Sequence, residues 1–300
     1  MTPGTVLAGR YEIERPIGRG GMSTVFRARD LRLFQPVAVK RLDLSACDPA
    51  EQAGMAAHLA REGRLLARLS HPALVVVRDC FEEDGRPHLV TDFIEGRDLQ
   101  TVMDTEPGGL EPHRLWAWVQ QVLDALEYLH SRQPPVLFRD LKPANLMVDR
   151  SGQVKLVDFG IARAMLPGRG TTALLRGFGT PGYAPIEQYG AGTDTRSDLY
   201  SLGATLYALA TRQTPPDAVR LASGEQCLTR VSSPPGLGRV IERLMQTRKE
   251  ARYPCVAEVR AALRAVYEPA PATRRQVAYC PFRDAQPLPG VPSPAPDPWT

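Results

Sequence analysis

The pattern of apolar residues changes about one third of the way along the chain. In about the first ninety residues the apolar side chains form short β-prone runs, at residues 11–17, 25–28 and 37–40. Such short runs, some of them alternating, are typical of strands. From Asp98 onward the apolar residues recur mostly every three or four positions, which predicts helices. The chain is therefore expected to be an α+β protein in which strands and helices are segregated.

The same patterns predict the individual elements. Inside the strand-rich part, one helix is expected at about residues 49–69, on a stripe that includes Leu66 and Leu69. Two further strands are expected at residues 74–77 and 88–94, with a turn at residues 82–85 between them. Helices are expected at residues 112–131, 197–211, 237–246 and 256–266. In the first of these, Trp116 and Trp118 are expected to divide between core and surface.

Composition excludes several classes of protein. With 300 residues, 43% apolar and 23% charged, the chain can bury a substantial core. The net charge of +4 argues against a strongly basic nucleic-acid binder. No apolar run approaches the roughly 18–20 residues of a membrane helix, and no signal peptide is visible. Five scattered cysteines fit a reduced, cytoplasmic protein.

Three features in the strand-rich part could belong to a phosphate-binding site, although each has an ordinary structural explanation. Residues 18–25 read Gly-Arg-Gly-Gly-Met-Ser-Thr-Val, and glycines let backbone N–H groups approach a phosphate closely. A glycine-rich hairpin turn would look the same. Lys40 is either an exposed strand lysine or a phosphate ligand. Glu62 is either a solvated helix edge or the partner of a buried cation.

A stronger signal lies in the run Phe138-Arg-Asp-Leu-Lys-Pro-Ala-Asn145 and in Asp158-Phe-Gly160, which follows a predicted strand. Asp140 can accept a hydroxyl proton, Lys142 can neutralise a phosphoryl oxygen, and Asn145 and Asp158 supply the hard oxygen ligands that a divalent cation prefers. Each piece could be a turn or a cap, but the combination in this order indicates phosphoryl transfer.

With these motifs, residues 11–266 resemble the eukaryotic-like protein kinase superfamily in its bacterial serine/threonine branch. The resemblance implies a two-lobed kinase domain over residues 11–266. Its small lobe, residues 11–94, would hold a β-sheet and one helix, and its larger lobe, residues 95–266, would be mostly helical. Residues 267–300 are rich in proline and are expected to form a disordered tail.

The resemblance also implies ATP and Mg²⁺ (or Mn²⁺) as ligands, and it assigns roles. Lys40 would contact the α- and β-phosphates and pair with Glu62, Asp140 would deprotonate the substrate hydroxyl, and Lys142 would stabilise the transferred group. Asn145 and Asp158 would bind the metal. The nucleotide would contact Ile17, Gly18, Arg19, Gly20, Gly21, Met22, Ser23, Thr24, Val25, Ala38, Lys40, Thr91, Asp92, Ile94 and Met147.

Three positions depart from the family pattern. Phe138 replaces the usual histidine and should complete a stack with Leu66, Val77 and Phe159. Ser23 replaces the third glycine of the loop. Pro185-Ile186-Glu187 replaces Ala-Pro-Glu, with Arg252 as the expected ion-pair partner of the glutamate. By the same resemblance, Asp198 should cap the backbone of the catalytic loop.

The predicted function is transfer of the γ-phosphoryl group of ATP to serine or threonine hydroxyls of proteins. Thr171 or Thr172 would be phosphorylated during a transient association of two copies, and the phosphate would pair with Arg139 and Arg163. Thr180 would hydrogen-bond near Asp140 and Lys142. An ATP-binding pseudokinase scaffold and a small-molecule phosphotransferase of related fold are the alternatives. Lys142 and the Gly179-Thr-Pro-Gly-Tyr183 segment favour a protein substrate.

Overall fold

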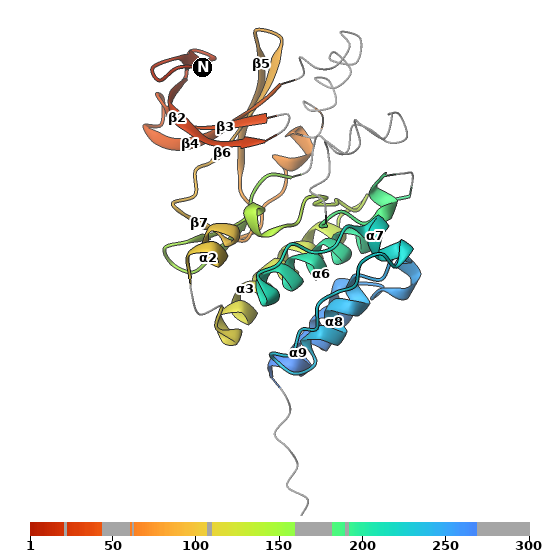
Figure 1. Ribbon diagram of the computed structural model, residues 1–300. Coiled ribbons are helices and arrows are strands. Elements are labelled where there is room, and N and C mark those ends of the chain that lie inside the picture. The colour runs from red at the N-terminus through yellow and green to blue at the C-terminus, as the bar shows by residue number, and fades with distance from the viewer. Residues whose placement is uncertain are drawn as a thin grey trace, which may run out of the picture. The chain divides into compact units, whose positions relative to one another are not determined.

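An antiparallel sheet of six strands forms the N-terminal part of the structure, a computed structural model that describes residues 1–20, 23–43, 61, 63–106, 110–159, 182–189 and 192–268. The strand order is β1-β2-β3-β4-β6-β5 (Figure 1). Their bounds are β1 (Val6–Leu7), β2 (Tyr11–Gly20), β3 (Ser23–Asp30), β4 (Gln35–Leu42), β5 (Val77–Glu83) and β6 (Arg86–Asp92). Of the strands predicted at residues 11–17, 25–28 and 37–40, each is confirmed and is longer than expected.

Alternation along β4 decides which side chains leave the sheet on each face. Val37 and Val39 join a buried cluster on one face with Tyr11, Phe26 and Val90. Because side chains alternate along a strand, Ala38, Lys40 and Leu42 point to the other face. Thus Lys40 is directed away from the cluster that closes the sheet, towards the side that carries the cleft described below.

The strand predicted at residues 74–77 is wrong. Here β5 begins only at Val77, and Leu74 forms an isolated bridge to Leu156. The backbone of this segment is paired elsewhere, since Leu156 N donates to Ala73 O and Val75 N donates to Leu156 O. β6 ends at Asp92, two residues before the predicted end at residue 94. The turn predicted between the two strands is confirmed, with Asp84 and Gly85 at positive φ.

Only the end of the predicted helix at 49–69 falls within the described residues. Residues 63–66 are helical, and Leu69 lies beyond the helix end. Leu66 is buried, together with Val77, Phe138 and Phe159, in the main hydrophobic cluster, as the expected stack requires.

A second, three-stranded sheet orders β7 (Gly96–Asp98), β8 (Leu146–Asp149) and β9 (Val154–Leu156). The segment between β7 and β8 contains α2 (Leu99–Thr105), α3 (Pro112–His130) and the 3-10 helix η1 (Pro143–Asn145). This sheet therefore joins the two ends of a long, mainly helical segment, residues 99–145. It also places η1, at the end of that segment, directly before β8.

The remaining elements are helical. They are η2 (Ile186–Tyr189), α6 (Thr195–Thr211), α7 (Ala218–Ser223), α8 (Leu237–Leu244), η3 (Lys249–Ala251) and α9 (Val256–Tyr267). Helix α6 contacts α8, and α9 contacts both α8 and the earlier helix α3 (Figure 1). The four predicted helices are confirmed with ends within two residues of those expected.

Both tryptophans of α3 are buried, each with 4% of its surface exposed, so the expectation that they divide between core and surface is wrong. Trp116 stacks on Tyr267 of α9 with 5.2 Å between ring centroids. Trp118 is covered by the Arg114 guanidinium, 4.5 Å from its ring centroid. The helical stripe did not reveal either cover, because both come from outside the predicted core face.

Residues Met1–Glu268 form one compact unit, separate from Pro269–Thr300, which lie outside the described residues. None of the helices in the described part of the chain has the length and apolar character needed to cross a bilayer.

Candidate active site

The loop between α3 and β8 brings Asp140, Lys142 and Asn145 together. Lys142 Nζ lies 3.1 Å from a carboxylate oxygen of Asp140. Asn145 Nδ2 donates to the carbonyl oxygen of Asp140 at 2.8 Å, and Asn145 O accepts from Val157 N at 2.9 Å. The short helix η1 makes these contacts possible because it turns the chain back within three residues. The loop thereby ties itself to the strand that leads to Asp158.

The carboxylate of Asp198, in the first turn of α6, is hydrogen-bonded to the backbone of this loop. It accepts from Phe138 N at 2.9 Å and from Arg139 N at 2.8 Å. The Nε2 atom of His130 donates to the same carboxylate at 2.9 Å. The predicted capping of the catalytic loop by Asp198 is confirmed. Because a buried carboxylate is costly unless hydrogen-bonded, the three donors explain how a side chain only 1% exposed can carry this role.

Lys40 and Asp158 form an ion pair across 118 residues of sequence. Asp158 follows β9 and has φ of 64°. This conformation costs a non-glycine residue free energy, and it persists only where the surrounding structure imposes it. The next residue, Phe159, is buried and meets Phe138 edge to face with 5.0 Å between ring centroids. This packing fixes the backbone that carries the Asp158 carboxylate.

These groups share one cleft of about 540 Å³, within the range of small-molecule sites. Lys40, Asn145, Asp158 and Lys142 all line it. Of the residues expected to contact the nucleotide, those that line it are Ile17, Gly18, Arg19, Gly20, Ser23, Val25, Ala38, Lys40, Thr91, Asp92, Ile94 and Met147.

The remaining expected residues do not all belong to the cleft lining. Thr24, which pairs with Arg19 and Arg41 in the sheet, is not part of it. Gly21, Met22, Glu62 and Gly160 lie outside the described residues, and so do Arg163, Thr171, Thr172 and Thr180. The expected pair between Lys40 and Glu62 therefore stays a prediction.

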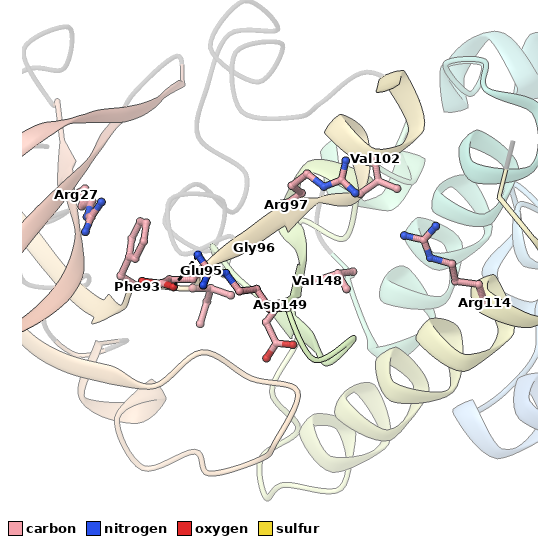
Figure 2. A pocket seen from close by; sticks show the side chains of 11 residues that line it. Arg27, Phe93, Glu95, Gly96, Arg97, Val102, Arg114, Val148 and Asp149 are labelled. Carbon is pink, nitrogen blue, oxygen red and sulfur yellow. Dashed lines mark ion pairs between the residues drawn. The ribbon is translucent and has the colours of Figure 1, made fainter. Parts of the chain in front are cut away.

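A second cavity of about 580 Å³ lies around residues 93–97 (Figure 2), and its lining also includes Arg27, Arg114 and Arg150. Each of its arginines is paired with a carboxylate. Arg27 pairs with Glu14 at 2.9 Å, Arg150 with Glu95 at 3.4 Å, and both Arg97 and Arg114 with Glu106, at 3.5 Å and 2.8 Å. Each arginine thus already has an ion-pair partner, and Lys40, Asn145 and Asp158 line the other cavity. The candidate active site is therefore the smaller cleft.

The glutamate of the Pro-Ile-Glu motif is anchored in the C-terminal part. Arg252 NH1 and NH2 donate to the Glu187 carboxylate at 2.6 Å and 3.0 Å, as predicted, and Ser197 Oγ donates at 2.9 Å. Burial raises the pKa of Glu187, but the Arg252 hydrogen bonds and charge outweigh it and leave the pKa below its usual value. The carboxylate is thus ionised at neutral pH.

Sequence reasoning missed two residues of this region. None of the motifs points to His130, yet it supports Asp198. Gln188 was not considered, yet its Nε2 atom donates to Arg139 O at 2.7 Å. No spacing in the sequence could have paired these residues, because each contact joins segments at least 49 positions apart. The only available signal was that Gln188 directly follows the motif glutamate.

A β-rich lobe and a helical lobe that share a cleft with a lysine, an amide and a carboxylate define the two-lobed kinase class of fold. Solved structures agree with this class. The chain aligns with the M. tuberculosis PknI kinase domain with a TM-score of 0.72 and 27% identity, covering 89% of this chain and 99% of that chain. PpkA-294 in its apo form aligns with a TM-score of 0.71 and 27% identity, covering 88% and 99%.

The chain belongs to the protein kinase domain family, whose model matches residues 11–250. It is 34% identical to the serine/threonine-protein kinase PknB of Mycolicibacterium smegmatis over 89% of this chain and 44% of that protein. It is 39% identical to the serine/threonine-protein kinase pkn2 of Myxococcus xanthus over 71% of this chain and 25% of that protein. The chain thus spans less than half the length of these curated relatives. The resemblance to bacterial serine/threonine kinases inferred from the motifs is confirmed.

Proposed function

We propose that this chain is an ATP-dependent protein kinase that transfers the γ-phosphoryl group of ATP to serine or threonine hydroxyls. The observation that carries the proposal is the convergence of Lys40, Asn145 and Asp158 on one cleft, next to Asp140 and Lys142. The similarity to proteins named serine/threonine kinases supports the same activity. We assign the activity to residues 11–266, divided near residue 94, with residues 267–300 as a tail.

The residues fit a divalent metal ion. The Asn145 amide has its nitrogen engaged with Asp140 O, which leaves its oxygen as the ligand atom, and Asp158 supplies a carboxylate in the same cleft. Both are the hard oxygen donors that Mg²⁺ or Mn²⁺ prefers. A metal ion held there would neutralise charge on the phosphate oxygens. In this proposal Lys40, which pairs with Asp158, would contact the phosphates beside the metal ion.

Asp140 and Lys142 would act on the other partners of the reaction. In the proposed role, Asp140 orients the substrate hydroxyl and accepts its proton. Lys142, 3.1 Å from Asp140, neutralises charge on the transferred group. The apolar lining of the cleft, including Val25, Ala38 and Met147, would hold the adenine. Catalysis then consists mostly of positioning and charge neutralisation.

The test is phosphorylation of a generic basic protein from labelled ATP. Asp140→Asn and Asp158→Ala are each expected to lower kcat by about 100-fold or more, because each removes a group that acts at the reacting atoms. Asp104→Asn, at an exposed position of α2 outside the cleft, is the matched control and should retain full activity. If the unaltered chain bound ATP but transferred no phosphoryl group, the pseudokinase alternative would hold.

We further propose that Thr171 or Thr172 is phosphorylated by a second copy of the chain during a transient encounter. The support is their position between Asp158 and Glu187 and the presence of Arg139 next to Asp140. Phosphopeptide mapping of the wild type and of Asp140→Asn tests it. Equal phosphate at these threonines in both proteins would contradict autophosphorylation.

The proposed location is the cytoplasm. It is supported by Cys80, Cys227 and Cys255, each of which is a free thiol in the part of the chain that the structure describes. Fractionation of cells that produce the native protein tests this location, and recovery with the membranes would contradict it.

A further inference from the structure

Gln188 reaches from η2 to the loop that carries Asp140. Its Nε2 atom donates to the carbonyl oxygen of Arg139 at 2.7 Å, across 49 residues of sequence. We propose that Gln188 is a positioning residue that fixes the peptide unit between Arg139 and Asp140 and so orients the Asp140 carboxylate. This inference rests on the proposed kinase activity and names a further residue on which that activity depends.

The peptide unit before Asp140 needs such support. Arg139 has φ of 68°, in the left-handed region that non-glycine residues occupy only when their surroundings impose it. Its N–H group is held by Asp198 at 2.8 Å, and its C=O group is held by Gln188. The carbonyl of Asp140 itself is held by Asn145 at 2.8 Å. Removing the Gln188 contact would leave the C=O of Arg139 without the donor that now sets its direction.

Gln188 acts from a rigid base. Its neighbour Glu187 is bound by Arg252, whose side chain has 0% of its surface exposed. The backbone of Gln188 donates to Pro185 O at 3.0 Å, and Tyr183 O accepts from Ser201 Oγ at 2.8 Å. The segment 182–189 is therefore fixed to α6 and to the region before α9. Through Gln188, that anchored segment also determines where the catalytic loop lies.

The amide group itself is what this position uses. Within the described part of the chain, Oε1 of Gln188 is buried and receives no hydrogen bond. An apolar side chain of similar size would avoid that desolvation. The contribution of glutamine is thus the donor that meets Arg139 O. An ionised glutamate would place a negative oxygen against that carbonyl, whereas a protonated glutamate could donate its O–H.

This difference defines the experiment. We would measure kcat and KM for ATP and for a generic basic protein in the wild type, Gln188→Met and Gln188→Glu, at pH 6 and pH 8. Both variants should lower kcat about 5- to 10-fold at pH 8, while KM for ATP stays within about twofold, because the nucleotide site is untouched. At pH 6 the deficit of Gln188→Glu should shrink, and that of Gln188→Met should not.

The matched control is Gln100→Met, since Gln100 is a half-buried glutamine on α2 that bonds Asp104 and lies outside the site. It should behave as the wild type. If Gln188→Met fails to fold, the comparison of Gln188→Glu at the two pH values still decides. The positioning role would be overturned if kcat were unchanged in both variants, or if Gln188→Glu lost the same fraction of kcat at both pH values. An inactive wild type would instead overturn the proposed kinase activity, and this inference with it.

Discussion

Asp198 illustrates how much of the catalytic loop depends on single side chains. One carboxylate in α6 receives two backbone N–H groups and His130, and it thereby fixes Phe138 and Arg139. Hydrogen bonds to a charged acceptor are stronger than those between neutral groups. The hydrogen bonds to Asp198 of α6 therefore hold the conformation of this loop, although residues 135–141 belong to no helix or strand.

His88 gives the fold a sensitivity to acid. It is 1% exposed and stacks on Phe81 with 5.0 Å between ring centroids. Burial is the main cause that lowers the pKa of His88 below its usual 6.5. A backbone hydrogen bond with Arg86 and the charge of Glu83 oppose this effect, and the charges of Arg41 and Arg86 add to it. Because the folded state holds the proton less tightly, the unfolded chain gains protons first, and stability falls as the pH drops below about 6.5.

We therefore expect His88→Phe, which keeps the ring, to lose less stability than the wild type between pH 7 and pH 5. For one proton the difference is at most about 1.4 kcal/mol per pH unit. Urea unfolding at several pH values measures it. His113→Gln, at an exposed position of α3, is the control. Parallel pH profiles for wild type and His88→Phe would contradict the assignment.

Among the elements, α6 supports the site most directly. Asp194 caps its N-terminus in a capping box with Ser197, and its first turn carries Asp198. The helix is buried along nearly its whole length, so almost any change of side-chain volume is felt by its neighbours. It is the base on which both the catalytic loop and the Glu187 anchor rest.

Gly203 shows how closely α6 approaches α8. A Cβ at this position would lie 2.6 Å from Leu244 Cβ and 3.0 Å from Met245 Cγ. Alanine would raise helix propensity by about 1 kcal/mol, but overpacking costs about 1–3 kcal/mol. Because the nearest atom is a Cβ that cannot rotate away, packing should win, and Gly203→Ala should lower the free energy of unfolding.

Chemical denaturation measures this change. Ala117→Gly, exposed on α3, reports helix propensity alone and should cost about 1 kcal/mol. A Gly203→Ala protein more stable than the wild type would show that α6 and α8 separate readily.

At the scale of the whole molecule, α9, the last helix of the described chain, packs against α3. Trp116 stacks on Tyr267, and its Nε1 atom donates to a carboxylate oxygen of Glu268 at 2.8 Å. The end of α9 thus covers an aromatic side chain from the middle of the chain. The predicted domain end at residue 266 would leave both partners of Trp116 outside.

We expect a chain ending at Glu268 to unfold in the same cooperative transition as the full chain and to keep its kinase activity. A chain ending at residue 266 should expose Trp116 and lose about 1–3 kcal/mol, since it removes a buried aromatic contact and a hydrogen bond. Tryptophan fluorescence during urea unfolding reports both effects. Equal stability of the two truncated chains would contradict this role of Tyr267 and Glu268.

The local order of residues along the chain was enough to predict segregated strands and helices, the positions of α3, α6, α8 and α9, and the motifs around Asp140 and Asp158. These features depend on periodicity and on neighbours a few residues apart, which a linear chain already displays. The burial of Trp116 under α9, the pairing of residues 73–75 with β9, and the roles of His130 and Gln188 depend instead on contacts between distant segments. Such contacts exist only after packing brings the segments together, because no spacing along the chain encodes which side chain will cover or hold another.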